Sequence, residues 1–335
     1  MGIAKLSVLM PYRNAASTLS RAIESILQQS FTDFELILVD DGSTDSSKEI
    51  SCQYEDKRIR NVSIPESGIV AALNKGLAIS QGKYIARMDA DDYSYPERLK
   101  LQYEFLDRNP DIGIVSGQVS FKGNRKKNKG YALYVDWINQ QISPEQIYLN
   151  RFVESPIAHP SVMIRKMLLD RFGSYREGDF PEDYELWLRM MDQDVRFSKI
   201  DKIILDWYDE ETRLSRIHKR YSVEAFYRIK TKYFTKWFMN RFQQKLPPLL
   251  IWGTGKSVLQ KSKYLDEYGL TISGYIDVVS KPDKKIRNKP VFYYKNIPAN
   301  VFILSYVSDR VGRLEIHEYL IKKGYKEGKD FYLMA

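Results

Sequence analysis

The chain has 335 residues, of which 43% are hydrophobic and 28% charged, a composition typical of a globular protein with room for two cored domains. Its single cysteine, Cys52, excludes intrachain disulfides and cysteine zinc sites. With no bilayer-length apolar run and no signal peptide, a cytoplasmic location is expected. The net charge of +9 favours an anionic partner, such as anionic lipid or a phosphorylated substrate, and no nucleic-acid motif accompanies it.

Buried strands and amphipathic helices alternate in the first part of the chain. The predicted strands are residues 6–10, 35–39, 60–64 and 84–88, and the predicted helices include residues 17–29 and 67–80. Strands that alternate with helices of this length predict a mainly parallel sheet. In such sheets ligands bind beyond the carboxyl ends of the strands. Polar segments at those ends are therefore candidates for a common site.

Three polar segments follow these strands. They are residues 11–14, the pair Asp40 and Asp41, and the run 89–92 with its three aspartates. Alternation along an extended backbone points Asp89 and Asp91 the same way, and a hard cation such as Mg²⁺ would offset their repulsion. The last run also fits an acidic loop that caps a helix starting at residues 95–97. Because all three segments fall at one edge, we interpret them as one site.

Taken together, Ser-Val-Leu-Met-Pro at 7–11, Val-Asp-Asp-Gly-Ser-Thr-Asp at 39–45 and Arg-Met-Asp-Ala-Asp-Asp at 87–92 resemble glycosyltransferase family 2. These are inverting transferases of GT-A fold, and the resemblance covers roughly residues 5–220. It implies an α/β fold in which a mainly parallel sheet is flanked by helices. It also implies a nucleotide-sugar donor and a divalent metal, Mg²⁺ or Mn²⁺.

The resemblance also assigns donor-side residues. Those implied for nucleotide binding are Pro11, Arg13, Asp40, Asp41, Asp89, Asp92, Arg213, Ser215 and Arg216, and those implied for the metal are Asp91, Asp89 and His218. Asp41, with Asp40 beside it, would contact the base, Asp89 would face the ribose and Asp91 would hold the metal on the diphosphate. Arg13 stands where the family often has an aromatic residue, although a guanidinium plane can also stack.

The same resemblance implies that a segment after the strand at 203–207 closes over the donor diphosphate. Arg213 and Arg216 suit this role because guanidinium forks pair with phosphate oxygens, and Ser215 lies between them. A surface loop with ordinary salt bridges is the alternative reading of the same residues.

On the acceptor side, the resemblance makes Asp183 the catalytic base. Its neighbour Glu182 lies three residues after Asp179, as in a capping box, and is also a candidate acceptor contact. The first turn of this helix favours an anion on electrostatic grounds alone, so capping is the competing role for both acids. His159, which precedes a proline, is a further acceptor-side candidate, and a structural histidine is the alternative.

The remainder of the chain predicts a second domain. Residues 220–245 are basic and aromatic at near-helical spacing, which fits either packing between domains or an interfacial helix on anionic lipid. After the prolines at 247–248, a strand, a turn with Gly253 and Gly255, and a second strand ending at Asp277 match a dinucleotide-binding pattern. Val258 takes the place of the third glycine. We expect domains at 1–218 and 248–335, joined by a connector at 219–247.

The sequence thus predicts an inverting, metal-dependent glycosyltransferase that moves a sugar from a nucleotide sugar, expected to be a UDP-sugar, to an acceptor hydroxyl. The expected acceptor is a glycan or lipid-linked glycan of bacterial-type surface polysaccharide assembly, with peripheral contact to an anionic membrane. Two alternatives are an NAD- or nucleotide-binding oxidoreductase or accessory protein acting through a Rossmann-like C-terminal domain, and a nucleotidyltransferase. The second lacks the basic, glycine-rich loop after the first strand that such enzymes use.

Overall fold

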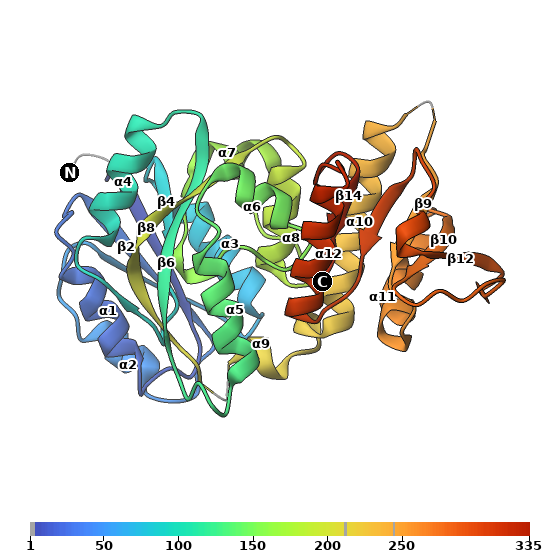
Figure 1. The fold of residues 1–335 in the computed structure, drawn as a ribbon. Helices are drawn as coiled ribbons and strands as arrows, with labels where there is room; N and C mark the ends of the chain where they lie inside the picture. Colours follow the sequence, from blue (N-terminus) through green and yellow to red (C-terminus); the bar gives the residue numbers. More distant parts are fainter. Residues whose placement is uncertain (1–3, 211–212, 244) are drawn as a thin grey trace. The chain divides into compact units, whose positions relative to one another are not determined.

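The computed structural model describes residues 4–210, 213–243 and 245–335, and the chain divides into two compact units (Figure 1). The first unit contains Met1–Tyr148, Pro156–Gly178 and Glu182–Ile217. The second contains Leu149–Ser155, Asp179–Pro181 and His218–Ala335. Residues 219–247, expected from the sequence as a connector, fall within the second unit.

An eight-stranded sheet forms the centre of the first unit, in the order β3-β2-β1-β4-β7-β6-β8-β5. The strands are β1 (Leu6–Tyr12), β2 (Phe34–Asp41), β3 (Ile59–Ile64), β4 (Tyr84–Arg87), β5 (Tyr93–Ser94), β6 (Ile112–Lys122), β7 (Met163–Arg165) and β8 (Arg196–Tyr208). Strands β3, β2, β1 and β4 are mutually parallel, whereas β7 is antiparallel to both of its neighbours. The expected mainly parallel sheet is confirmed.

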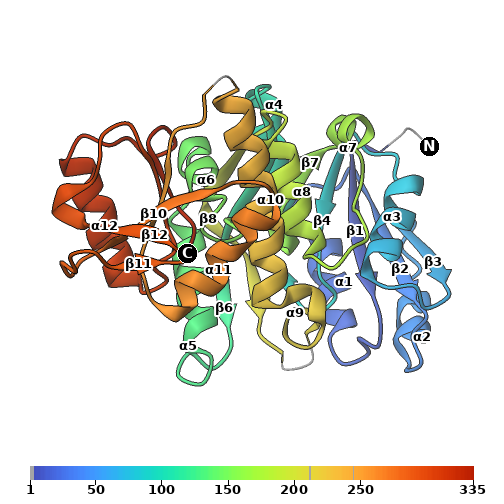
Figure 2. The ribbon, with the colours of Figure 1, turned by 90° about the vertical axis from the view of Figure 1, so that its right-hand side faces the viewer.

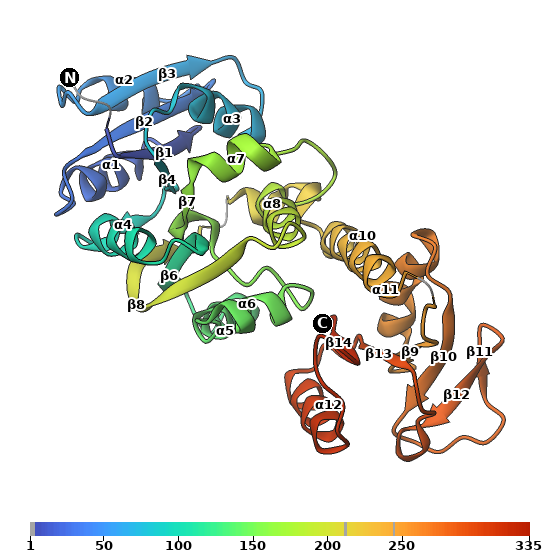
Figure 3. The ribbon, with the colours of Figure 1, turned by 90° about the horizontal axis from the view of Figure 1, so that it is seen from above.

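Helices cover both faces of this sheet. They are α1 (Leu19–Leu27), α2 (Ser47–Cys52), α3 (Ile69–Ile79), α4 (Arg98–Arg108), α5 (Lys129–Asn139), α6 (Pro144–Asn150), α7 (Lys166–Phe172), α8 (Glu182–Met191) and α9 (Leu214–Ile217). In Figure 3, α1 and α4 lie on one side of the sheet, and α3, α7 and α8 on the other. Alternation along β1 sends Leu6, Val8 and Met10 into the first core and Leu9 into the second.

The second unit has a six-stranded sheet in the order β11-β12-β10-β9-β13-β14. Its strands are β9 (Leu249–Trp252), β10 (Ile272–Asp277), β11 (Lys285–Ile286), β12 (Lys289–Tyr293), β13 (Phe302–Ser305) and β14 (Phe331–Leu333). All are parallel except β11. Helices α10 (Val223–Arg241) and α11 (Lys256–Glu267) lie on one face and α12 (Arg310–Lys322) on the other (Figures 2 and 3).

The aromatic residues of α10 pack against this second sheet. Phe234 and Phe238 are buried, and their ring centroids lie 6.1 and 5.1 Å from that of Phe302 in β13. The aromatic spacing of residues 220–245 therefore reflects a core contact within one unit. Among the residues described, no helix combines the length and apolar character needed to cross a bilayer.

Candidate active site

The carboxyl ends of three neighbouring strands bring the predicted site segments together. β1 lies between β2 and β4, with Tyr12 beside Asp40 and Leu9 beside Arg87. Pro11 and Tyr12 are buried at the end of β1, and the aspartate run begins two residues after β4 ends. The three polar segments therefore share one edge of the sheet.

At the end of β2, both acids hold the loops around them. Asp40 accepts the N–H of Ser43 at 3.0 Å, and Asp41 accepts the N–H groups of Ser67 at 2.8 Å and Gly68 at 3.0 Å. Gly42 has φ +68°, and a Cβ there would lie 2.6 Å from the backbone nitrogen of Glu66. Only glycine fits this turn, which brings the acids next to the start of α3.

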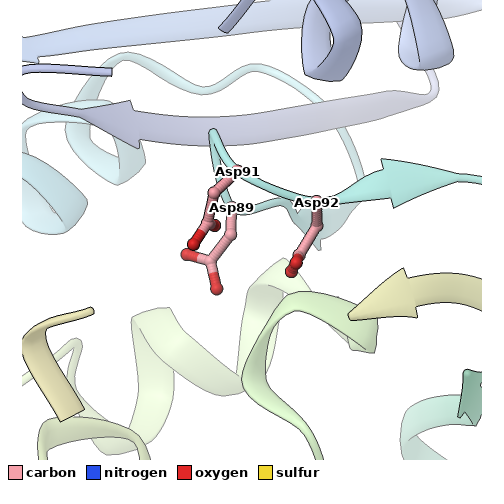
Figure 4. Close-up of side chains that lie close together, drawn as sticks. All are labelled: Asp89, Asp91 and Asp92. Atoms are coloured by element: carbon pink, nitrogen blue, oxygen red, sulfur yellow. The ribbon is translucent and has the colours of Figure 1, made fainter. Parts of the chain in front are cut away.

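The aspartates after β4 form one cluster (Figure 4). Each of Asp89, Asp91 and Asp92 offers an oxygen within 4.8 Å of the others, and all three carboxylates project to the same side of the loop. Asp92 is fully buried and accepts the N–H of Tyr208 at 2.9 Å, whereas Asp89 and Asp91 are partly open to solvent. Burial and the charge of Asp89 raise the pKa of Asp91 above its usual value.

Two arginines offset the charge of this cluster. Arg213 places Nη2 3.2 Å from Asp89 and Nε 3.7 Å from Asp91, and its Nη1 donates to the carbonyl of Tyr208 at 2.7 Å. Arg87, which is buried, pairs with Asp89 from the other side. Burial opposes the charge of Arg87, but Asp89 and other nearby groups raise its pKa above its ordinary value.

The chemistry of the cluster fits a hard divalent cation. All its donors are carboxylate oxygens, the ligands that Mg²⁺ and Mn²⁺ accept, and the buried Oδ2 of Asp92 has no hydrogen-bond partner. Arg213 offsets part of the negative charge of Asp89 and Asp91. A bound divalent cation would offset more of that negative charge. The residues present therefore fit the metal expected from the sequence.

A second acid group lies at the start of α8. Asp183 is half-buried and accepts the N–H of Tyr184 at 2.7 Å, while Glu182 beside it is buried. Desolvation, followed by repulsion from Glu182, raises the pKa of Asp183 from 3.8 to about 7, and Arg87 partly opposes this shift. A carboxylate whose pKa lies near neutral pH is matched to proton transfer.

The buried Tyr175 holds His159, a candidate acceptor-side residue. The charges of Asp183 and Asp89 both act on its hydroxyl, whose pKa burial raises above its ordinary value. The hydroxyl lies 2.7 Å from Nε2 of His159, a buried ring that packs edge-to-face against Trp187. Burial, followed by the charge of Arg87, lowers the pKa of His159 well below its usual value, so the ring is neutral.

The remaining donor-side candidates are exposed or have other partners. Arg13 is exposed and pairs with Glu66 at 2.6 Å. Arg216 pairs with Asp209, and Ser215 is exposed on the short helix α9. His218 belongs to the second unit, where its Nδ1 accepts the N–H of Arg220 at 3.2 Å.

The residues predicted to bind a nucleotide in the C-terminal domain, Gly253, Gly255 and Asp277, all lie in the second unit. Gly253 has φ +117°, which a side chain rarely adopts, and follows β9 at the turn into α11. The carboxylate of Asp277 accepts the hydroxyl of Thr254 at 2.8 Å and an N–H of Lys281 at 3.3 Å. Gly255 precedes α11 with open space where a Cβ would stand.

Sequence reasoning assigned no role to Arg87 or Tyr175. A signal for Arg87 existed, because a charged residue in an otherwise apolar buried strand requires a partner. Tyr175 had no such local signal. Asn74 of α3 exchanges two hydrogen bonds with its backbone, at 2.9 and 3.1 Å, and fixes its place across 101 positions of sequence.

Comparisons with known proteins agree with this geometry. The sequence model of the family described as "Glycosyl transferase family 2" matches residues 7–173. The putative glycosyltransferase EpsE of Bacillus subtilis is 30% identical over 228 residues, which cover 66% of this chain and 78% of that protein. The uncharacterized glycosyltransferase MJ1057 of Methanocaldococcus jannaschii is 29% identical over 238 residues, or 68% of this chain and 79% of that one. The chain belongs to glycosyltransferase family 2.

Solved structures place this family 2 chain in the GT-A fold. The crystal structure of residues 1–349 of S. aureus TarS in complex with UDP-GlcNAc superimposes with a TM-score of 0.56 and 21% identity. The match covers 79% of this chain and 71% of that one. The chain is thus a glycosyltransferase with the sheet architecture expected for this family.

Proposed function

We propose that this glycosyltransferase moves a sugar from a nucleotide-sugar donor, expected to be a UDP-sugar, to an acceptor hydroxyl with inversion at the anomeric carbon. The observation that carries the proposal is the cluster of three aspartates at the carboxyl edge of the sheet in a family 2 chain. Asp89, Asp91 and Asp92 form the cluster after β4, and Asp183, whose pKa is raised to about 7, offers a base at the start of α8. The UDP-GlcNAc bound by the related TarS fold supports a uridine nucleotide.

The donor side of this site would hold the diphosphate. Asp91, with Asp89 and Asp92, would hold Mg²⁺ or Mn²⁺, which when bound supplies positive charge to the leaving nucleoside diphosphate. Asp40, Asp41, Arg13 and Pro11 would surround the nucleobase at the ends of β1 and β2. Ser215 and Arg216 would contact the phosphates, and His218 would contact the metal or the phosphates.

The acceptor side would be built around α8. Asp183 would accept the proton of the acceptor hydroxyl while that oxygen forms a bond to the anomeric carbon and the bond to the diphosphate oxygen breaks. Such a general base contributes about 10²–10⁴-fold to the rate. Glu182 and the neutral His159 would border the acceptor, with His159 held by Tyr175. Single displacement gives inversion.

The donor class can be tested by a thermal-shift screen of the full chain. UDP, GDP, TDP, CMP and NAD would each be added with and without Mn²⁺, because a ligand that binds the native state raises its stability. We expect a manganese-dependent shift with UDP. A shift with NAD alone, independent of metal, would instead support chemistry in the second unit.

The acceptor is proposed to be a glycan or lipid-linked glycan of bacterial-type surface polysaccharide assembly, with the protein at the cytoplasmic face of the membrane. The net charge of +9 supports contact with anionic lipid. Co-sedimentation with anionic but not neutral vesicles, lost at high salt, would test that contact.

The activity of the enzyme is expected to fall below neutral pH. Because the pKa of Asp183 is raised to about 7, this carboxyl is protonated, and inactive as a base, at lower pH. We expect kcat/KM to decline about tenfold per pH unit below 7 and to level off above it. A pH–rate profile with saturating Mn²⁺ would measure this limb, and a flat profile from pH 5 to 8 would argue against Asp183 as the base.

Arg213 is expected to compete with the metal when no nucleotide is bound. Its guanidinium lies 3.2 Å from Asp89 and 3.7 Å from Asp91, the carboxylates proposed to hold the metal. A metal ion held there would carry the same sign of charge as the guanidinium, and like charges about 4 Å apart near a protein surface repel by roughly 4 kcal/mol. Arg213→Ala should therefore tighten Mn²⁺ binding to the nucleotide-free enzyme, by about tenfold or more, while weakening binding of UDP with Mn²⁺.

Manganese binding to the Arg213 variant can be followed by electron paramagnetic resonance, independently of turnover. Arg216→Ala is the matched control, because Arg216 pairs with Asp209 and should leave the affinity of the nucleotide-free enzyme for Mn²⁺ unchanged. Weaker Mn²⁺ binding after Arg213→Ala would show that this arginine organises the carboxylates instead of competing for them.

A further inference from the structure

Four basic side chains from three helices of the second unit interact with one another through their charges. They are Lys230 of α10, Lys261 of α11, and Arg310 and Arg313 of α12. Lys230 and Lys261 lie 3.8 and 4.9 Å from the ring centroid of Tyr227, which stacks on Tyr306 just after β13. We define these four residues as the basic cluster.

The basic cluster lies where a parallel α/β sheet binds ligands. The Nζ of Lys230 donates to the carbonyl of Met334, the residue after β14, at 2.7 Å, and to that of Val153 at 2.8 Å. Arg310 and Arg313 begin the helix that follows β13. The order of this sheet reverses between β9 and β13, and ligands of such sheets bind beyond the carboxyl ends of the strands at this reversal.

Part of the positive charge of the basic cluster lies at a helix start, where the helix dipole disfavours cations. Cations at the start of a helix oppose its dipole, yet Arg310 and Arg313 occupy the first turn of α12, which contains no acid. The N-cap carboxylate of Asp309 is hydrogen-bonded to the N–H of Gly312 at 2.8 Å. Glu154 supplies one negative charge that acts on Lys230, Arg310 and Arg313. The four basic residues outnumber the two nearby acids, Glu154 and Asp309, so the group keeps a net positive charge.

The cations also repel one another. Burial, with added repulsion from Lys261 and Arg313, lowers the pKa of Lys230 to about 7. Burial and the charge of Arg310 lower the pKa of Arg313. Holding like charges together in partly buried positions costs stability, and a bound anion would offset that cost.

We infer that the basic cluster is a binding site for a phosphorylated small molecule, separate from the donor site of the transferase. Phosphate oxygens accept charge-assisted hydrogen bonds from both ammonium and guanidinium groups. Because Lys230 is buried and Lys261 and Arg313 are half-buried, the site suits a small soluble anion more than a flat membrane surface. The second unit would then sense or hold a phosphorylated metabolite.

The test is calorimetric titration of the full chain with inorganic pyrophosphate in EDTA, which removes metal from the donor site. The double variant Lys261→Gln with Arg313→Gln should raise the Kd of pyrophosphate by about a hundredfold, since each lost charge-assisted bond costs roughly a factor of ten. Lys263→Gln, an exposed lysine of the same helix α11, is the matched control and should leave the Kd unchanged. Equal Kd values in the double variant and the wild type would overturn the proposal.

Thermal stability supplies a second readout that does not depend on pyrophosphate affinity. Without a ligand, Arg313→Gln should raise the melting temperature, because it removes a repelling cation. Pyrophosphate should stabilise the wild type more than sulfate does at matched ionic strength. A lower melting temperature for unliganded Arg313→Gln, or equal stabilisation by sulfate, would indicate a structural cluster without a phosphate site. Binding of UDP with Mn²⁺ should stay at the wild-type level throughout, which separates this result from the donor site.

Discussion

Asp183→Asn is expected to lower kcat by about 10²–10⁴-fold while leaving the dissociation constant of the nucleotide donor nearly unchanged. Asparagine keeps the size of the side chain but cannot accept the proton of the acceptor hydroxyl. Asp183 lies on α8, whereas the acids proposed to bind the donor follow β2 and β4. Steady-state kinetics and calorimetric binding of UDP with Mn²⁺ would measure the two quantities separately.

Glu182→Gln is the matched control for this prediction. Glu182 precedes Asp183 on α8, and its charge raises the pKa of Asp183. The glutamine variant should retain most of kcat and move the acidic limb of the pH–rate profile to lower pH. If Asp183→Asn weakened donor binding as much as it slowed turnover, the proposed division between base and donor site would be wrong.

Asp183→Asn is also expected to change the stability of the folded protein, an effect that can be measured without an activity assay. The pKa of Asp183 is raised from 3.8 to about 7 in the folded protein, so the folded state binds this proton more tightly than the unfolded chain. Stability contributed by the protonated carboxyl is therefore lost as pH rises from about 4 through 7. Asp183→Asn should raise the melting temperature relative to the wild type at pH 8 but not at pH 4.

Asp91→Asn should abolish metal-dependent nucleotide binding and reduce kcat by about 10³-fold. Metal stabilisation of a leaving group contributes several kcal/mol, and each 1.4 kcal/mol corresponds to about a factor of ten. The asparagine removes charge from the aspartate cluster while preserving side-chain shape. Calorimetric titration of UDP with and without Mn²⁺, together with kcat, would measure the loss.

Asp201→Asn controls for the loss of one negative charge, because Asp201 is an exposed residue of β8 that accepts a hydrogen bond from Gln118. This variant should bind UDP with Mn²⁺ as the wild type does. Retention of manganese-dependent UDP binding by Asp91→Asn would refute the role of Asp91 as a metal ligand.

Local patterns in the sequence predicted much of the transferase unit. Apolar runs marked the strands at 6–10, 35–39 and 84–88, because a strand buried on both faces reads as a continuous hydrophobic segment. Ligands of parallel α/β sheets bind beyond the carboxyl ends of the strands, and this rule predicted that Asp40, Asp41 and Asp89 lie at one edge of the sheet. The motifs at these ends identified the family, since each motif is contiguous in sequence.

Local patterns were less informative about the second unit and about the short elements. Strands β5, β7, β11 and β14 are only two or three residues long, which is too short to show a periodic pattern of hydrophobic residues. The aromatic residues of α10 indicated a buried stripe but not its partner. Phe234 packs against Phe302 and Tyr332, which lie far along the chain.

The sequence by itself determined which strands the polar segments follow, to which family the chain belongs, and which acids lie at the sheet edge. Each of these depends on residues that are close to one another in sequence. Only the tertiary structure decided how those acids are charged and which side chains face them. Arg87 and Arg213 pair with Asp89 although they are 126 positions apart in sequence, and the hydroxyl of Tyr175 contacts His159. Burial and Coulomb interaction depend on distance in space, and chain folding alone brings such distant residues together.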